Sequence, residues 1–288
     1  MRFEYIEPVT IQEAVSSLMK YDGKAKVIAG GTDLVVQMRQ KAVRPEYVVD
    51  ITQIPGLDYV RFDEKQGLRI GALSTIRSLE KSEELRQRCP VISLAAGCLG
   101  SVAVRNQGTL GGNLCNAAPS AEMAPSLIGL SAKAKIVGPE GERVVPLEDF
   151  FKGPGLTVLK KGELLVEIQV PDPSPGVRGV YLKHSIRGSI DLAIVGVAVI
   201  GDFEPKSNTC KDVRIVLGAV APTPMRARGA EEVLRGKKIK DPLVEESAEK
   251  ASAESRPITD VRASEWYRKE IVRVLTRQGL RKVMGQTS

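Results

Sequence analysis

The pattern of apolar and polar positions divides the first part of the chain into short strands that alternate with helices. Apolar residues recur at helical spacing over residues 10–20 and 32–41, and short apolar runs occupy residues 24–28 and 47–51. Short strands separated by helices are typical of a parallel sheet with right-handed crossovers. The pattern therefore predicts a small α/β module over residues 1–57.

The following stretch combines strands with a longer helical region. The pattern predicts a strand at 67–73 and helical structure from 75 to 99, which Pro90 must interrupt because proline cannot continue a helical hydrogen-bond ladder. Three more strands are predicted at 133–137, 144–147 and 164–170. A proline-rich linker at 171–176 then ends this second module, which we place at residues 58–175.

The last part of the chain changes from strands to helices. Strand-like runs are found first, at 180–184, 192–200 and 213–220, and helical patterns follow at 226–235, 242–254 and 263–284. This order favours a C-terminal α+β domain over residues 176–288, in which a three-stranded antiparallel sheet is joined by helices. The chain as a whole is predicted to be of the α+β class.

Composition excludes several other classes of protein. Of the 288 residues, 42% are hydrophobic and 27% are charged, which is the balance of a folded protein. The N-terminus lacks the apolar run of a signal peptide, and no stretch reaches the roughly 18 apolar residues of a membrane span, so we expect a cytoplasmic protein. The net charge of +7 would permit nucleic-acid binding, but the basic residues are scattered and only 4% of residues are aromatic, so we expect none.

Residues that commonly carry catalysis or bind metals are scarce. The four cysteines form no C-x-x-C pair, so the sequence predicts neither a zinc site nor a cysteine-ligated iron-sulfur cluster. His184 is the only histidine, and no G-x-S-x-G motif occurs, so we predict no catalytic residue. Such a protein can still take part in redox chemistry if a bound cofactor supplies that chemistry.

The first candidate binding element is the pair Gly30-Gly31. It follows the apolar run 27–29 and precedes a predicted helix. Backbone N–H groups at such a strand-to-helix turn are unpaired, and glycine lets an anion come close. The signatures of ordinary Rossmann and P-loop proteins, G-x-G-x-x-G before a helix and G-x-x-x-x-G-K-[ST], are both missing.

A second glycine pair, Gly111-Gly112, has small polar neighbours. Thr109 and Asn113 flank it, and their hydroxyl and amide groups can donate hydrogen bonds to phosphate oxygens. Either pair alone is equally consistent with an ordinary turn. Together, two donor-rich turns indicate a site that could clamp a diphosphate from both sides.

Longer motifs around these turns identify a family. The chain resembles, essentially end to end, the FAD-binding medium subunits of the xanthine dehydrogenase and aerobic carbon monoxide dehydrogenase family of molybdenum hydroxylases. The most specific feature is the order and spacing of the two glycine loops. The resemblance rests on the segments IAGGTDL at 28–34, VRNQGTLGGNL at 104–114, GAVAPTP at 218–224 and RASEWYR at 262–268.

The resemblance implies a fold and a set of cofactor-binding residues. Residues 1–57 and 58–175 would be the halves of an FAD-binding unit of the vanillyl-alcohol-oxidase (PCMH-like) type, with FAD extended between them and the C-terminal domain covering the flavin. Where the family usually has an aspartate, this chain has a glutamate that is one methylene longer. The implied cofactor-binding residues are Val27, Ile28, Ala29, Gly30, Gly31, Thr32, Asp33, Leu34, Gly100, Thr109, Leu110, Gly111, Gly112, Asn113, Glu122, Leu165 and Lys183.

The resemblance also implies a role within a larger complex. A molybdopterin large subunit would oxidise the substrate, a [2Fe-2S] small subunit would relay electrons, and FAD on this chain would pass them to NAD, oxygen or a quinone. Relatives of this kind form heterotrimers. Two alternatives remain open, namely a self-contained flavin oxidoreductase and a non-catalytic FAD carrier or assembly protein.

Overall fold

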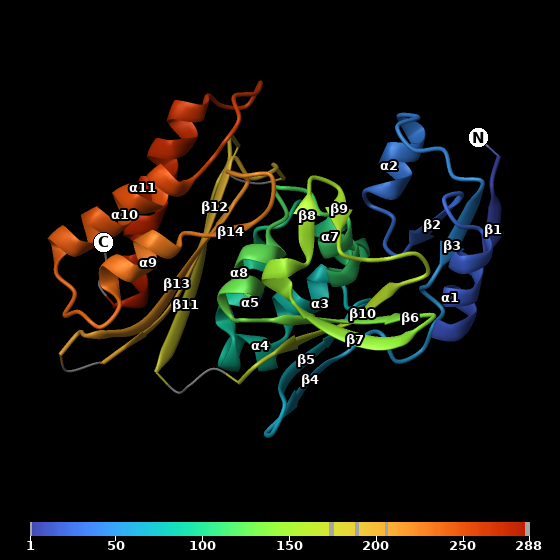
Figure 1. Ribbon diagram of the computed structural model, residues 1–288, viewed down its shortest axis with the longest axis horizontal. Coiled ribbons are helices and arrows are strands. Elements are labelled where there is room, and N and C mark those ends of the chain that lie inside the picture. Colours follow the sequence, from blue (N-terminus) through green and yellow to red (C-terminus); the bar gives the residue numbers. More distant parts are fainter. Residues whose placement is uncertain (1, 173–175, 188–189, 205–206, 286–288) are drawn as a thin grey trace.

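Three sheets follow one another along the long axis of the molecule. The computed structural model describes residues 2–172, 176–187, 190–204 and 207–285. The N-terminal sheet lies at one end, a five-stranded sheet in the middle and a four-stranded sheet at the other end (Figure 1). Within the described residues, no helix has both the length and the apolar character needed to cross a membrane.

The first sheet is parallel, as the alternation of strands and helices predicted. Its strand order is β1 (Glu4–Ile6), β3 (Tyr47–Asp50) and β2 (Ala25–Ile28). The helices α1 (Ile11–Lys20) and α2 (Leu34–Arg39) connect these strands, and the Thr10 side chain caps α1 by accepting from the Glu13 N–H. Strand β1 was not predicted, because it has only three residues and none of them is buried.

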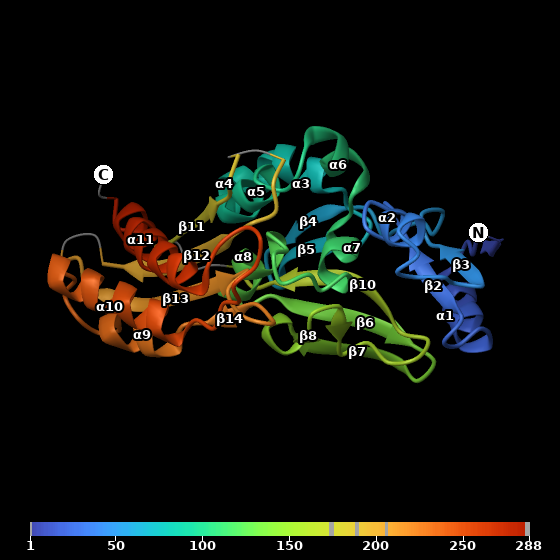
Figure 2. The same cartoon turned by 90° about the horizontal axis from the view of Figure 1, so that it is seen from above.

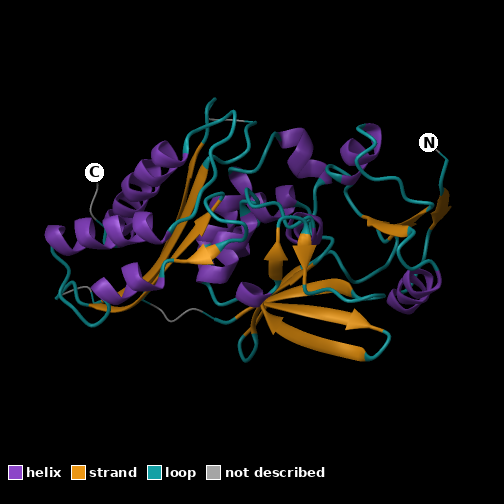
Figure 3. Ribbon diagram, turned by 45° about the horizontal axis from the view of Figure 1, so that its top comes forward, coloured by secondary structure: helices purple, strands orange, loops and turns teal. Residues whose placement is uncertain are grey.

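The second sheet is antiparallel and has helices over one face (Figure 3). Its strand order is β4 (Val60–Asp63), β5 (Gly67–Gly71), β10 (Leu164–Val170), β6 (Lys133–Gly138) and β7 (Gly141–Pro146). The accompanying elements are α3 (Ile76–Lys81), α4 (Glu83–Arg88), α5 (Pro90–Gly97), α6 (Val102–Gln107), α7 (Leu110–Cys115), α8 (Met123–Gly129), the 3-10 helix η1 (Leu147–Asp149) and the hairpin β8 (Phe151–Gly153) and β9 (Leu156–Thr157).

The predicted helical region 75–99 is divided into three helices. Pro90 begins α5, as the sequence predicted, because proline is tolerated in the first turn of a helix. A second break at Ser82 was not predicted. At Ser82 the backbone N–H donates to Ser78 O at the end of α3, and the side chain begins α4 by accepting a hydrogen bond from the Leu85 N–H.

The third sheet is antiparallel, with the strand order β11 (Val177–His184), β12 (Val195–Phe203), β13 (Cys210–Gly218) and β14 (Met225–Arg226). The three predicted strands are present, and the two-residue β14 adds a fourth at the edge. The helices α9 (Arg228–Leu234), α10 (Asp241–Glu254) and α11 (Glu265–Val283) follow. Part of the predicted linker, residues 173–175, lies outside the described residues.

Helices cover both faces of the third sheet. The C-terminal helix α11 packs on β11 and β12 from one side, whereas α5 and α8 of the preceding region contact the sheet from the other (Figure 2). Ala198, Ile200 and Val216 therefore belong to the same buried cluster as Leu127 and Phe150. This shared core joins the third sheet firmly to the preceding region.

Candidate functional site

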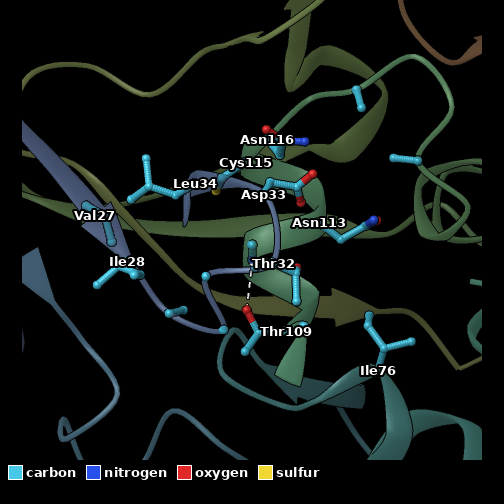
Figure 4. Close-up of a pocket in the computed structure, with 18 of the residues that line it drawn as sticks. Val27, Ile28, Thr32, Asp33, Leu34, Ile76, Thr109, Asn113, Cys115 and Asn116 are labelled. Carbon is cyan, nitrogen blue, oxygen red and sulfur yellow. Dashed lines mark hydrogen bonds between the residues drawn. The ribbon is translucent and has the colours of Figure 1, made fainter. Parts of the chain in front are cut away.

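A cavity of about 730 Å³ lies where α2, α7 and the start of α8 approach one another. Its size suits a small-molecule or cofactor site. Residues 190–192, which precede β12, form part of the rim, and Figure 4 shows many of the lining side chains. All but two of the predicted residues line this cavity, namely Val27, Ile28, Ala29, Gly30, Gly31, Thr32, Asp33, Leu34, Gly100, Thr109, Gly111, Gly112, Asn113, Glu122 and Leu165.

The loop between β2 and α2 lines the cavity and contains a row of backbone amides that are unpaired within the described residues. Within the described residues, the N–H groups at positions 30–33 donate no hydrogen bond, and the first amide of this segment that does so is Val35 N–H, to Gly31 O at 3.0 Å. Gly31 has a φ of +68°, a left-handed conformation that glycine adopts without strain. Such a row of donors at the start of a helix favours an anion.

The second glycine pair does not form the donor-rich turn that the sequence predicted. Gly111 and Gly112 lie inside α7, which Thr109 caps. The amides are already used within the protein: Leu110 N–H donates to Ser74 O at 2.9 Å, Gly111 N–H to Ala72 O at 2.8 Å, and Gly112 N–H to Thr109 Oγ1 at 3.1 Å. The pair was assigned to a turn because glycine is a poor helix former, but here the threonine cap and the hydrogen bonds to Ala72 and Ser74, just after β5, outweigh that tendency.

The glycines differ in what a side chain would meet. A Cβ on Gly30 would lie 1.9 Å from Gln107 O, and one on Gly111 would lie 2.8 Å from Ala72 O. Both positions require glycine because the backbone of another segment passes close by. A Cβ on Gly112 would meet only the Thr109 hydroxyl, at 2.9 Å. Gly112 is therefore not held by a neighbouring backbone, and it lines the cavity.

Two polar side chains of the cavity have no partner among the residues that the structure describes. Asn113 Oδ1 is buried without a hydrogen bond, and Asp33, at the start of α2, makes no side-chain cap. Burial raises the pKa of Asp33. A buried acceptor left unpaired, as Asn113 Oδ1 is, costs about 1 to 3 kcal/mol, whereas Asp33 is partly open to solvent. Both groups would gain from a ligand that donates hydrogen bonds.

Glu122 and Lys183 form a buried ion pair beside the cavity. Lys183 Nζ lies 2.8 Å from Glu122 Oε1, and it also donates to Cys98 O at 2.8 Å and Asp191 O at 2.6 Å. The two side chains are only 8% and 6% exposed. Burial raises the pKa of Glu122, and Lys183 opposes that effect. The sequence placed both residues at the site but did not predict their contact.

Lys183 and Leu110 are the two predicted residues that do not line the cavity. Lys183 contacts two residues that do, Glu122 and Asp191. Leu110 is fully buried in the core of the second region, so its side chain supports α7 from behind. Its inclusion came from the motif that contains it, and the structure gives it a packing role.

Several lining residues were not predicted from the sequence. Gln37 Nε2 donates to Asn116 Oδ1 at 3.2 Å, which joins α2 to the end of α7 across the site. Asn116 follows Asn113 by three positions, a spacing that places two side chains on one helical face. That signal could be used only after residues 110–115 were known to be helical. Leu192, exposed by 61%, lies on the rim.

The remaining reactive groups lie elsewhere or are buried. His184 is not part of the cavity, and its Nε2 lies 3.1 Å from the Tyr267 hydroxyl. The cysteines are free thiols, and burial raises the pKa of Cys89 to about 11 and that of Cys210 to about 12. No three side chains of the kinds that ligate metals are grouped together in the described part of the chain.

Two family models together match almost the whole chain. One, described as the FAD binding domain in molybdopterin dehydrogenase, matches residues 1–173, and the other, the CO dehydrogenase flavoprotein C-terminal domain, matches residues 180–283.

Individual relatives match over nearly their full length. The glyceraldehyde dehydrogenase medium chain of Sulfolobus acidocaldarius is 34% identical, with 98% of each chain covered. The carbon monoxide dehydrogenase medium chain of Hydrogenophaga pseudoflava is 33% identical, covering 97% of this chain and 96% of its own. A crystal structure of Cu,Mo-CO dehydrogenase superimposes with a TM-score of 0.95 at 30% identity, covering 100% of this chain and 99% of that one.

Proposed function

The chain belongs to the FAD-binding medium subunits of the carbon monoxide dehydrogenase and xanthine dehydrogenase family of molybdenum hydroxylases, and on this basis we propose that it relays electrons. It would receive them from iron-sulfur clusters on another chain and pass them to an external acceptor. The observation that carries this proposal is the row of unpaired amides at positions 30–33, which faces the cavity of an FAD-binding domain.

The cavity residues fit FAD chemically. The amides at 30–33 would hold the negatively charged diphosphate. Asp33 and the orphaned Asn113 Oδ1 would accept hydrogen bonds from cofactor hydroxyl or N–H groups. We place the flavin ring at the end lined by Gly100, Glu122 and Leu192, next to the C-terminal domain. FAD supplies the redox chemistry, and these side chains bind and orient it.

The lining favours a relay over a self-contained oxidase. A substrate-oxidising site needs a free acid or base within reach of the substrate. At the end that we assign to the flavin ring, Glu122 is engaged by Lys183 and Asp191 by Arg187, and the single histidine lies outside the cavity. The unpaired Asp33 carboxylate belongs to the loop that we assign to the diphosphate. The proposal therefore assigns substrate oxidation to a molybdopterin large subunit and electron delivery to a [2Fe-2S] small subunit. Co-purification of the chain with the products of its neighbouring genes would test this assembly.

Electron transfer is tested on the full-length chain loaded with FAD. Its flavin, once reduced, should be reoxidised by at least one of NAD, oxygen and a quinone analogue, and stopped-flow absorbance would identify the acceptor. The chain alone should oxidise no substrate of the hydroxylase complexes. Substrate turnover by the chain alone would favour the self-contained oxidoreductase, and a bound flavin that no donor reduces would favour the carrier.

The binding geometry is tested with Asn113→Leu, and Asn106→Leu serves as the matched control because Asn106 is exposed on α6. Removing the orphaned acceptor should leave the apoprotein as stable as the wild type or more stable. FAD affinity should fall about tenfold, since one to two hydrogen bonds are lost. Fluorescence titration of the apoprotein with FAD measures this. Unchanged affinity in Asn113→Leu would refute the assignment of Asn113.

A further inference from the structure

The turn that joins α5 to α6 has three successive carbonyl groups held by two cations. Lys183 Nζ binds Cys98 O at 2.8 Å. Arg105 Nη1 binds Leu99 O at 2.9 Å and Gly100 O at 3.1 Å. Carbonyls just beyond a helix end have no partner within the helix, and cations satisfy them well. The path of the backbone through this turn is therefore set by the two cations.

Arg105 is held in place from its other side by a carboxylate. Its side chain is almost fully buried, and its Nε donates to Glu80 Oε2 at 2.8 Å. Glu80 Oε2 also accepts from Arg77 Nη1, at 2.7 Å. Burial alone would raise the pKa of Glu80, but the hydrogen bonds from the two arginines outweigh it and lower that pKa. The carboxylate stays charged and keeps the Arg105 guanidinium oriented toward the turn.

The carbonyl contacts determine where the amides of the turn point. In a trans peptide the C=O and the next N–H point in opposite directions. Leu99 and Gly100 line the cavity, whereas Arg105 and Glu80 do not, so Arg105 lies on the far side of the turn. Because Arg105 binds Leu99 O, the Gly100 N–H of the same peptide points away from Arg105, and Gly100 itself lines the cavity. That N–H has no acceptor among the described residues.

We propose that Arg105 is a positioning residue, which holds the Gly100 N–H in place as a hydrogen-bond donor to the flavin ring. The inference rests on the proposed function, which places the ring at this end of the cavity. A donor at the ring stabilises the electron-rich reduced flavin more than the oxidised flavin. Arg105 therefore raises the midpoint potential of the bound flavin, although it touches neither the cofactor nor the electron acceptor.

The test compares Arg105→Met with Arg77→Met in the full-length, FAD-loaded chain. Both variants remove a cation from Glu80, but only the first removes the contacts to Leu99 O and Gly100 O. Arg105→Met should weaken FAD binding about tenfold, the loss of one to two hydrogen bonds. Its midpoint potential, from a redox titration with a reference dye, should become more negative. Arg77→Met should match the wild type in both measurements.

The midpoint potential of the bound flavin distinguishes this positioning role from general support of the fold. If Arg105 only stabilised the turn, oxidised and reduced FAD would lose affinity equally and the potential would not change. Arg105→Lys, which keeps the charge but loses the paired contacts, also covers the case in which Arg105→Met does not fold. It should shift the potential in the same direction.

Three results would overturn the proposal: a wild-type potential in Arg105→Met, a wild-type potential in Arg105→Lys, or the same shift in Arg77→Met. The relay itself is judged separately, by electron transfer through the wild-type flavin. The two ideas can therefore fail independently.

Discussion

Replacing Lys183 by methionine removes one partner of a buried ion pair and leaves the Glu122 carboxylate unpaired. With side chains 8% and 6% exposed, solvent cannot compensate for the loss. Breaking such a pair typically costs about 3 to 5 kcal/mol. Methionine regains part of this by packing, so we expect Lys183→Met to lower the free energy of unfolding by about 3 kcal/mol.

A double-mutant cycle separates the pair from its surroundings. In Glu122→Gln the amide oxygen still accepts from Lys183, so that variant should lose about 1 kcal/mol. The double variant, which buries no charge, should be more stable than Lys183→Met alone. Urea unfolding of the apoproteins gives the difference in the free energy of unfolding between each of the three variants and the wild type, provided that the m value is unchanged. Lys211→Met is the control, because Lys211 is exposed on β13.

The stability of the Lys183→Met variant should also change with pH in a defined direction. Burial raises the pKa of Glu122, and removing Lys183 removes the charge that opposes this. A carboxyl whose native pKa lies above its unfolded pKa binds a proton more tightly in the native state. The free energy of unfolding therefore increases as pH falls through the native pKa, and it stops changing once pH is below the unfolded pKa. The destabilisation should therefore be smaller near pH 5 than near pH 8. A loss no greater than that of Lys211→Met, or one that grows on acidification, would refute this reasoning.

Three further predictions concern the glycines, a second buried cation and the thiols. Gly111→Ala should lower the free energy of unfolding by about 1 to 3 kcal/mol, with or without FAD, because its Cβ would lie 2.8 Å from Ala72 O. Gly112→Ala should mainly weaken FAD binding, so urea unfolding and FAD titration distinguish the two variants. Arg268→Met should lower the free energy of unfolding by about 3 to 5 kcal/mol, because Arg268 is 1% exposed and binds Ile194 O and Asp260. A loss below about 1 kcal/mol in urea unfolding, typical of an exposed pair, would contradict this. Cys210, whose pKa burial raises to about 12, should react with a thiol reagent only after unfolding.

Periodicity predicted the parts of the fold whose elements are long and have one consistently buried face. Helix α1 and strands β6 and β10 are examples, and so are the long helices of the C-terminal domain. Shorter elements were missed because their form depends on contacts distant in sequence. Strand β14 has only two residues and exists because β13 offers an open edge at Val216 and Leu217. Strand β12 is buried on nearly every residue, since helices cover both faces, so its start could not be placed by alternation.

Helix α7 shows why the candidate site was only partly predictable. Its sequence contains two glycines and would be assigned to a turn on propensity alone. The helix forms because Thr109 caps it and because the segment after β5 accepts its first amides, at Ala72 O and Ser74 O. Those acceptors are more than thirty positions away in sequence. The motif therefore indicated residues that line the cavity, but the second glycine pair is not the source of hydrogen-bond donors that it predicted.

The donors at this site must instead come from elements other than the second glycine pair. The amides of the first loop are unpaired because α2 begins there, and the amide of Gly100 is unpaired because Arg105 holds the adjacent carbonyl. Both sets arise from geometry set by another residue, either a helix start or a buried cation. Gly112 then contributes space, since its missing Cβ leaves the cavity open beside Asn113. The two similar glycine pairs would therefore contribute differently to the proposed site: the first would supply hydrogen-bond donors for the diphosphate, and the second would supply space.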